Sequence, residues 1–445
     1  MQIEPGDTAW VLAATAMVLI MTPGLAFFYG GMVRSKSVLN MLMMSFFTIG
    51  IVSVLWTIFG YGLAFGDSGS GIIGALDWSH LGSVVNSFPN NGGEYPIPEL
   101  SFSAFQLMFA VITPALISGA IADRTKLFAW GVFVAIWVSI VYFPVAHWVF
   151  DFGTKHSDGS ITGVGWLAAR GVLDFAGGTA VHINAGAAGL ALAIVLGKRV
   201  GFGRMPMKPH NLPLVLLGAG LLWFGWFGFN AGSSLGANAT AALALMNTQV
   251  ATAAALLGWL LVERLRDGHA TSLGAASGAI AGLVAITPAC AYVAPWAAVV
   301  IGLLAGAICS MAVALKYKLG FDDSLDVVGV HLVGGIVGCL SVGFFGSTAV
   351  NSLGANGLFY GGGSSLLGKQ ALGVVAVAGY SFVVTLILGF AIKYTIGFRI
   401  KEADEQGGID ISEHLELAYE LNPIGYGGFM VQHTSRSRAE ISVAP

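Results

Sequence analysis

The sequence has few charged residues, because lysine, arginine, aspartate and glutamate together make up only 10% of its 445 residues. Soluble globular domains carry about 25% charged residues, so this scarcity argues against a chain of several soluble domains. Hydrophobic residues account for 56% of the chain. The composition therefore predicts one integral membrane domain that crosses a lipid bilayer many times.

Cysteine is also scarce, and the three cysteines, Cys290, Cys309 and Cys339, all lie in apolar stretches. Their odd number and their positions argue against a disulfide framework or a metal site. The sequence also lacks a phosphate-binding glycine loop after a strand, a Cys/His metal spacing and a nucleophile-elbow motif. We therefore expect neither a nucleotide-driven pump nor an intramembrane hydrolase, no enzymatic activity, no cofactor and no nucleic-acid partner.

Eleven apolar runs approach the roughly 20 residues that a helix needs to span a bilayer. None alternates with period two, so we expect helices, an all-α polytopic fold and no barrel. The 63 glycines, at about twice the usual frequency, would let such helices pack closely. The runs are residues 9–32, 38–65, 102–122, 127–150, 174–196, 212–230, 239–262, 271–288, 295–315, 327–345 and 371–394.

The basic residues favour one side of the membrane. If the N-terminus is outside, all but three of the 20 lysines and arginines lie inside, the exceptions being Lys155, Arg170 and Lys369. This bias predicts the N-terminus outside and the C-terminus inside. The first run follows a short acidic segment without a basic region, so we expect a retained span and not a signal peptide. The predicted parts are a plasma-membrane domain over residues 1–396 and a cytoplasmic tail over residues 397–445.

Two histidines interrupt the apolar runs. His182 lies in the fifth run, within LDFAGGTAVHINAG, and His331 lies in the tenth, within LDVVGVHLVGG. An ionisable side chain at membrane depth is costly and is by default a functional candidate. A single histidine could equally serve helix packing, but two histidines in corresponding runs favour a functional pair.

The places of these two runs predict an internal repeat. Because five is odd, a second set of five helices threads the membrane in the opposite direction, which gives an inverted 5+5 repeat plus a final helix. Each histidine follows an acid, Asp174 or Asp326, which we expect to cap the start of its helix. At 1.5 Å per residue, His182 would lie roughly 12 Å and His331 roughly 7.5 Å along helices that enter from opposite faces. The two rings could then meet.

A pair of imidazoles in a narrow apolar pore suits particular cargoes. Burial favours the neutral ring, which offers one hydrogen-bond donor and one acceptor. Such a lining suits a small neutral polar molecule or a proton relay. It suits a bare alkali cation poorly, because few oxygen ligands are present to replace its water.

Aromatic and hydroxyl side chains lie at the predicted outer ends of three runs. Phe109 belongs to run three, Trp148 ends run four, and Trp226, Phe229 and Ser233 belong to the string WFGFNAGS at the end of run six. Aromatic faces bind cations, and a serine oxygen accepts an N–H. These residues predict a recruitment site for a cation. An interfacial aromatic belt is the alternative for Trp148 and Trp226.

Other polar residues have a plainer interpretation. Asp322 and Asp323 are predicted to form a solvated turn on an inner loop. The remaining histidines fall in loops, at run ends or in the tail and are expected to be solvated: His80, His147, His156, His210, His269, His414 and His433.

These motifs resemble those of the ammonium transporter (Amt/Mep/Rh) family, and within it the bacterial Amt branch. The similarity covers nearly the whole chain and rests on TPGLAFFYGGMVRSKSVLNMLMMSF, LDFAGGTAVHINAG, WFGFNAGS, LVAITPAC, DDSLDVVGVHLVGGIVG and GFRIKEADEQGGIDISEHLELAYE taken together. The resemblance implies a homotrimer of eleven-helix subunits, each with its own pore for ammonium or methylammonium. It also implies that the inner tail meets a PII-type signalling protein.

The resemblance further implies roles for single residues. The corresponding positions are the twin pore histidines His182 and His331, the deprotonation acid Asp174, the gate phenylalanines Phe109 and Phe229, the recruitment serine Ser233 with Trp226, and Thr287 of the eighth run. One position departs from the family pattern, because Phe150 stands where the family often has a tryptophan. We expect Trp148 or Trp166 to supply the missing ring.

The sequence thus predicts a transporter that recruits NH4+ outside, removes a proton and conducts NH3 past the histidines. The proton would stay outside or cross separately along the pair, and K+ would be excluded because it has no proton to give up. One alternative is a Na+-coupled carrier for an amino acid or a similar solute, which should contain unwound helices. Another is a sensor that binds ammonium and signals through its tail, although no output domain follows residue 394.

Overall fold

Every apolar run forms a helix, because a backbone in lipid must satisfy its hydrogen bonds within its own segment. The computed structural model describes residues 2–76, 80–83, 87–93 and 95–419. Among these residues, ten helical segments are long and apolar enough to cross a membrane. The eighth predicted run, residues 271–288, forms a shorter helix of 15 residues, α11 (Ser272–Ile286), most of which is buried.

The first five spans occupy the chain up to Leu196. Three of them contain a π-helical turn, a widened turn that often marks a functional position. In chain order the elements are α1 (Pro5–Met32); α2 (Val38–Leu55), η1 (Trp56–Gly60) and α3 (Tyr61–Phe65); α4 (His80–Ser83); α5 (Glu99–Ile117) and η2 (Ser118–Ile121); α6 (Leu127–Trp137), η3 (Val138–Tyr142) and α7 (Phe143–Phe150); the paired strands β1 (Thr154–Lys155) and β2 (Ile161–Thr162); and η4 (Gly178–Ile183) with α8 (Asn184–Leu196).

The second half contains the remaining spans and the described part of the tail. Its tenth span also begins with a π-helical turn, η5, which corresponds to η4 of the fifth span. The elements are α9 (Leu212–Gly232), α10 (Ala239–Asp267), α11, α12 (Pro295–Ala312) with α13 (Leu315–Leu319), η5 (Val328–Leu332) with α14 (Val333–Phe345), η6 (Leu358–Tyr360), α15 (Ser365–Thr395), α16 (Glu402–Gly407) and η7 (Asp410–His414).

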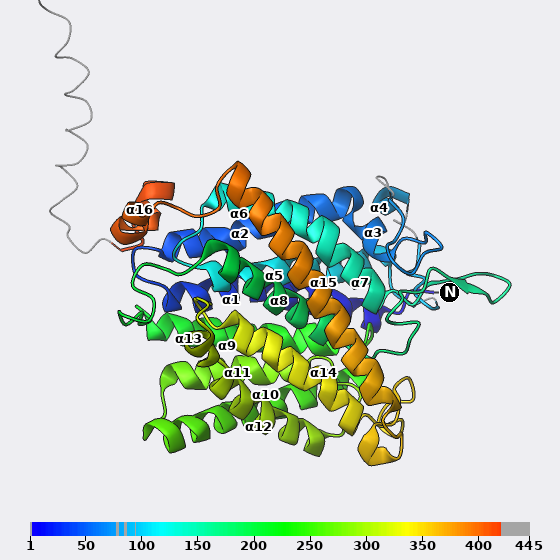
Figure 1. Cartoon of the computed structure of the whole chain (residues 1–445). Helices are drawn as coiled ribbons and strands as arrows, with labels where there is room; N and C mark the ends of the chain where they lie inside the picture. The colour runs from blue at the N-terminus through cyan, green and yellow to red at the C-terminus, as the bar shows by residue number, and fades with distance from the viewer. Residues whose placement is uncertain (1, 77–79, 84–86, 94, 420–445) are drawn as a thin grey trace, which may run out of the picture.

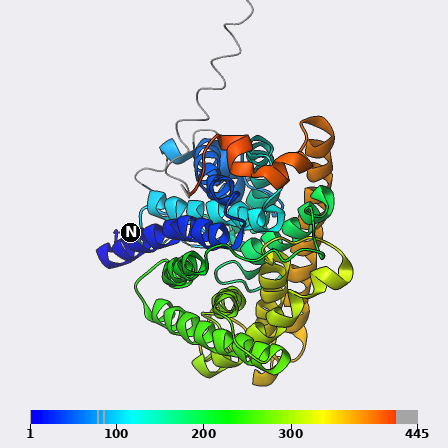
Figure 2. The ribbon, with the colours of Figure 1, turned by 90° about the vertical axis from the view of Figure 1, so that its left-hand side faces the viewer.

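The second five spans repeat the packing of the first five. α1 packs against α2 and α5, as α9 packs against α10 and α11; α2 packs against α6, as α10 packs against α12; and α5 lies against α8, as α11 lies against α14. In Figure 1 the blue-to-cyan helices fill the upper part of the view and the green-to-yellow helices the lower part. α15, in orange, crosses both groups in Figure 1 and lies along one side of the bundle in Figure 2.

The first helices of the two halves, α1 and α9, run antiparallel where they meet. At the end of α1 and the start of α9, the backbone N–H of Asn211 donates to the carbonyl of Gly31 at 3.1 Å. Near the other end of α9, a Cβ added to Gly228 would lie only 2.6 Å from the Cβ of Met17 in α1. Small residues allow this close approach of the two backbones. Antiparallel contact between corresponding helices is the arrangement that an inverted repeat predicts.

The described part of the tail folds back onto the end of the bundle. The Asp410 carboxylate accepts the N–H groups of Leu39 and Asn40 at 3.0 and 2.9 Å, at the start of α2. Glu405 pairs with Arg399 at 2.7 Å. The part of the predicted tail from residue 420 onward, with His433, lies outside the described residues.

Candidate functional site

The two histidines that the sequence pairs are in contact. His182 belongs to η4 and His331 to η5, the turns that open the fifth and tenth spans. Their Nδ1 atoms are 3.4 Å apart, and the rings lie at 20° with centroids 5.4 Å apart. Both side chains are buried. Across such a contact one Nδ1 donates and the other accepts, so two neutral rings share a single N–H.

The outer side of this pair is aromatic. The His182 ring stacks on Trp226, with centroids 5.2 Å apart, and lies 6.0 Å from Phe229. Trp226 is held in place because its Nε1 donates to Thr287 Oγ1 at 2.8 Å. Within the described residues, the buried Nε2 of His182 has no hydrogen-bond partner. A buried polar atom left unpaired costs about 1–3 kcal/mol, so this nitrogen is suited to a small ligand that offers or accepts an N–H.

Two stacked phenylalanines lie between the histidines and a cavity on the side of the bundle that the sequence predicts to be outer. The rings of Phe109 and Phe229 have centroids 4.2 Å apart and are tilted by 33°. Both residues are buried, and Phe109 also lines an outer cavity. A continuous series of contacts therefore leads from the cavity to Phe109, Phe229, His182 and His331.

The outer cavity has a volume of about 620 Å³ and brings together residues from several spans. Its lining includes Phe109, Phe150, Asp174 and Ser233. The Ser233 hydroxyl donates to the carbonyl of Phe229 at 2.8 Å, which leaves its oxygen lone pairs for a donor from the cavity. The cavity therefore presents an acceptor hydroxyl and several aromatic rings, among them Phe109 and Phe150, a combination that suits a small cation with N–H groups.

Trp148 lies apart from this cavity. Its Nε1 donates to the carbonyl of Ile72 at 2.7 Å, and its ring packs against Trp166 and Tyr380. Phe150 lines the cavity instead. Two positions of one helix that differ by two residues point roughly 200° apart, so only one of them can face the cavity. The ring at this wall is Phe150 itself, and the recruitment role of Trp148 stays a prediction without a cavity contact.

Asp174 caps the helix that carries His182, as predicted. Its Oδ1 accepts the N–H groups of Gly177 and Gly178 at 2.8 and 2.6 Å, and its Oδ2 accepts those of Thr179 and Ala180 at 2.7 and 3.2 Å. Gly177 has φ 121°, a conformation that favours glycine. The carboxylate is thus fixed by the helix start and still borders the cavity.

In the second half the capping acid is Asp323, so the prediction for Asp326 is wrong. The two oxygens of Asp323 accept the N–H groups of Val327 and Val328 at 3.1 and 2.8 Å. Asp326 has φ 65° and instead pairs with Lys316 at 2.6 Å. The sequence does contain the signal, because Asp323 precedes His331 by the same eight residues that separate Asp174 from His182.

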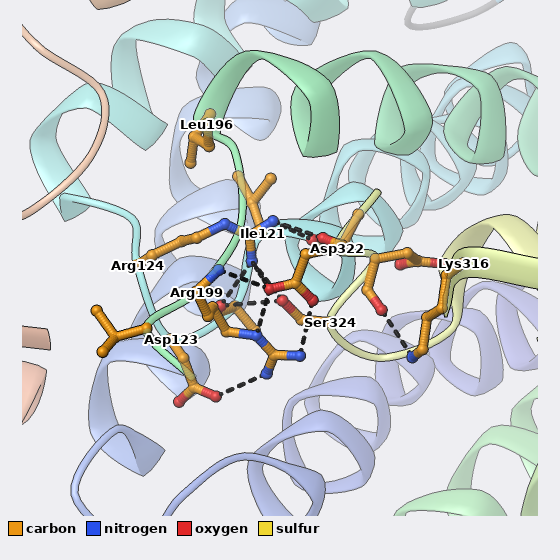
Figure 3. A network of polar contacts seen from close by, with 12 residues as sticks. Ile121, Asp123, Arg124, Leu196, Arg199, Lys316, Asp322 and Ser324 are labelled. Atoms are coloured by element: carbon orange, nitrogen blue, oxygen red, sulfur yellow. Dashed lines mark hydrogen bonds and ion pairs between the residues drawn. The ribbon is translucent and has the colours of Figure 1, made fainter. Parts of the chain in front are cut away.

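The predicted solvated turn at Asp322 and Asp323 is also wrong, because both side chains are buried. Figure 3 shows Asp322 facing Arg199, whose Nη2 and Nε lie 2.9 Å from the two carboxylate oxygens, while Arg199 Nη1 reaches Asp123 at 3.1 Å. Burial opposes ionisation of Asp322, but the hydrogen bonds and charge of Arg199 lower the pKa of Asp322. Burial lowers the pKa of Arg124, in the same network, to about 10.

Three histidines expected in solvent are engaged by the protein, and one of them, His414, has its Nε2 3.1 Å from the Oδ1 of Asn40. His147 is fully buried and pairs with Asp151 at 2.9 Å. His210 lies between the carbonyl of Val33 at 2.8 Å and the hydroxyl of Tyr419 at 2.9 Å. His156 is exposed, as predicted. The partners of His210 and His414 come from segments far away in the sequence, whereas Asp151 lies only four residues from His147.

Comparisons with known proteins agree with this arrangement. A family model described as Ammonium Transporter Family matches residues 9–419. A protein of Mycobacterium tuberculosis (strain ATCC 25618 / H37Rv) named "Ammonium transporter" is 55% identical over 444 residues, which cover 94% of this chain and 91% of that protein. The crystal structure of Saccharomyces cerevisiae Mep2 has a TM-score of 0.80 at 36% identity, covering 90% of this chain and 88% of that one. A structure titled "Sensor Amt Protein" has a TM-score of 0.81 at 30% identity and covers 92% and 98% of the two chains.

Proposed function

The chain belongs to the Ammonium Transporter Family, and from this premise we propose that it moves ammonium across the plasma membrane as neutral ammonia. NH4+ enters the outer cavity and loses a proton at the phenylalanine gate, and NH3 then passes His182 and His331. The proton stays outside or crosses separately along the histidine pair. The relatives are named transporters, and no enzymatic reaction is part of the proposal.

The observation that carries this proposal is the contact between two buried imidazoles, 3.4 Å apart at Nδ1. The shared N–H and the unpaired Nε2 of His182 offer hydrogen bonds to a neutral molecule with one lone pair and several N–H groups. Neither ring offers the shell of oxygen ligands that would replace the hydration of K+. Selectivity follows because ammonium becomes neutral by losing a proton and K+ does not.

Recruitment is proposed at the outer cavity, with Ser233 as acceptor and with Phe109 and Phe150 as aromatic faces. A cation against a partly desolvated aromatic ring gains about 0.5–2 kcal/mol. Trp226 supports the next step, because it stacks on His182 beneath the gate. Asp174 borders the cavity and is the carboxylate proposed to favour deprotonation. Methylammonium, which shares the charge and the N–H groups, is the proposed analogue substrate.

The placement in the membrane is part of the same proposal. The N-terminus lies outside and the C-terminus inside, in accord with the positive-inside rule. Eleven spans form the inverted 5+5 repeat plus α15, with α11 as the eighth. Three subunits form a homotrimer, and a PII-type protein meets the inner face near residues 397–419. The support for trimer and partner is the family resemblance.

The test is ammonium and methylammonium transport by the full chain in lipid vesicles, with His182→Ala compared with wild type. We expect a current on a solid-supported membrane after an ammonium jump and none after a K+ jump. His182→Ala should reduce the flux at least about tenfold, the effect of about 1.4 kcal/mol on the barrier. His156→Ala, which alters an exposed outer histidine, is the control and should transport like wild type.

Three outcomes contradict the proposal in different ways. Unchanged conduction and selectivity in His182→Ala would remove the histidine pair from the mechanism. Uptake that requires Na+ and ignores ammonium would favour the carrier. Saturable ammonium binding without flux would favour a sensor, the second candidate, which the likeness to the "Sensor Amt Protein" structure keeps in view.

A further inference from the structure

A buried histidine on the outer side of the bundle has both ring nitrogens facing oxygen atoms that accept hydrogen bonds. His147 lies in α7 and is fully buried. Its Nδ1 lies 2.9 Å from Asp151 Oδ2 and 3.1 Å from the carbonyl oxygen of Ala64, and its Nε2 lies 2.8 Å from the carbonyl oxygen of Ser70. The two carbonyl oxygens can accept hydrogen bonds but cannot donate them. The same is true of the Asp151 carboxylate in its ionised form.

The contact pattern fixes the protonation state of the ring. A neutral imidazole has one N–H and one bare nitrogen, and a bare nitrogen facing a carbonyl oxygen makes no hydrogen bond. Both nitrogens of His147 face acceptors, so both carry a proton and the ring is an imidazolium. Its charge is matched by the Asp151 carboxylate, which is the condition for keeping a charge buried.

The pair brackets the aromatic wall of the outer cavity. Phe150 lies between His147 and Asp151 in the sequence and lines the cavity. The carbonyl of Phe150 accepts the Asn91 amide N–H at 2.8 Å, and Asp151 Oδ1 accepts the N–H of Gly153 at 2.7 Å. Through the carbonyl of Ser70, the same ring also holds the loop that follows α3. The backbone that presents Phe150 is therefore tied on both sides.

We infer that His147 is a protonated positioning residue that, through Asp151, holds the Phe150 ring at the cation-recruiting cavity. This inference rests on the proposed function for the cavity. His147 touches neither the cavity nor the histidine pair, so it acts on the substrate only through Phe150. Its effect should fall on apparent affinity and spare the rate of passage.

The surroundings of His147 contain no second charged partner within the described residues. α3, η3 and η4 pack against α7, and none of these three elements carries an aspartate, glutamate, lysine or arginine. Glu99 is engaged by the Tyr61 hydroxyl at 3.0 Å. Removing the Asp151 charge should therefore remove the reason for the second proton on His147.

The first measurement reads the proton directly. We propose ¹⁵N NMR of the full chain labelled at histidine, with the His147 signal identified by its loss in His147→Gln. At about pH 7.5 an ordinary histidine is mostly neutral, whereas His147 should give the signal of two protonated nitrogens. Asp151→Asn should convert this signal to that of a neutral ring. A neutral His147 in the wild-type protein overturns the inference, independently of the transport measurements.

The second measurement reads the consequence for transport. In vesicles, His147→Gln and Asp151→Asn should each raise the KM for methylammonium about tenfold, the range of one cation–π contact, with Vmax within about twofold of wild type. The double variant should be no worse than either single variant, because the two residues act as one unit. Phe150→Leu should raise KM equally while leaving the His147 signal unchanged. This variant still tests the role of the Phe150 ring if His147→Gln or Asp151→Asn fails to fold.

The control is His156→Gln, since His156 is an exposed histidine near a carboxylate, Asp67, at 3.8 Å on the same outer side. Its KM should equal that of wild type. An unaltered KM in a folded His147→Gln protein contradicts the positioning role. A wild-type chain that does not transport methylammonium contradicts the proposed function instead, and the NMR result on His147 stands apart from that failure.

Discussion

Asp322 and Asp323 are neighbours in the sequence, yet their surroundings shift their acidities in opposite directions. Arg199 lies 2.9 Å from both oxygens of Asp322, and its hydrogen bonds and charge outweigh burial and lower the pKa of that carboxyl. Burial raises the pKa of Asp323 to about 6, although Lys316 and two backbone N–H groups oppose the shift. The contributions of the two carboxyls to the stability of the protein should therefore change in opposite directions with pH.

The stability of the protein should reflect this difference between about pH 4 and pH 6. The folded-state pKa of Asp323 lies above the usual value of about 3.9, so its contribution is complete below about pH 4 and is lost as the pH rises to about 6. Asp323→Asn keeps an acceptor for the helix and removes this titration. We expect the difference in Tm, variant minus wild type, to increase between about pH 4 and pH 6 and to stay constant above about pH 6.

Thermal unfolding in detergent checks this, with Asp322→Asn as the comparison of opposite sign. The lowered pKa of Asp322 means that its contribution is present above about pH 4 and is lost as the pH falls. Asp322→Asn should therefore lower Tm near neutral pH and lose this effect in acid. Parallel Tm curves for Asp323→Asn and wild type would show that Asp323 does not titrate in this range.

At the residue scale, the sequence identifies those side chains that differ in chemical character from their immediate neighbours in the chain. His182 and His331 stand out because an ionisable group in an apolar run is itself a signal. His147 does not, because its partners Ala64 and Ser70 come from a distant part of the chain. Asp323 is marked only by its spacing of eight residues from His331. Ring chemistry alone favours Trp148 over Phe150, and only the direction in which each helix position faces shows that Phe150 lines the cavity.

At the scale of the helix, close packing of α1 against α9 positions the two halves of the repeat. Gly228 lies where a Cβ would be 2.6 Å from Met17 Cβ and 2.8 Å from the carbonyl oxygen of Ala14. Gly220, on the same helix, has nothing within 4 Å of an added Cβ. The same substitution should therefore have opposite effects at the two positions.

We predict that Gly228→Ala destabilises the protein by about 1–3 kcal/mol, because an added methyl forces two packed helices apart. Gly220→Ala should be neutral or stabilising by up to about 1 kcal/mol, because alanine favours a helix over glycine. Denaturant or thermal unfolding in detergent measures both variants. Equal stability of the two would contradict the close helix approach described for α1 and α9.

Most elements follow from the sequence, and the exceptions have a tertiary cause. Apolar length alone predicts the long spans. The π-helical turns η4 and η5 are not visible in the sequence, because a shift in backbone hydrogen bonding leaves no pattern in hydrophobicity. α11 is shorter than its apolar run, which continues into the turn around Thr287.

At the scale of the whole molecule, the proposed orientation can be read by labelling. The three native cysteines are buried, so the unmodified chain should resist a membrane-impermeant maleimide. Ser160→Cys, on the exposed turn between β1 and β2, should react in intact cells. Ala403→Cys, exposed on α16, should react only after the membrane is opened. The reverse pattern would invert the proposed topology.

The paired rings of His182 and His331 are separated by 149 residues of chain. A ribosome that has made the first ring must still extend the polypeptide through α8, α9, α10, α11, α12 and α13 before the second exists. Under the proposed mechanism, an unfinished protein in the membrane therefore holds half of the hydrogen-bonding lining and no complete route for protons or ammonia. Biosynthesis can proceed without a leak, because the passage comes into being only when both halves of the translated chain have met.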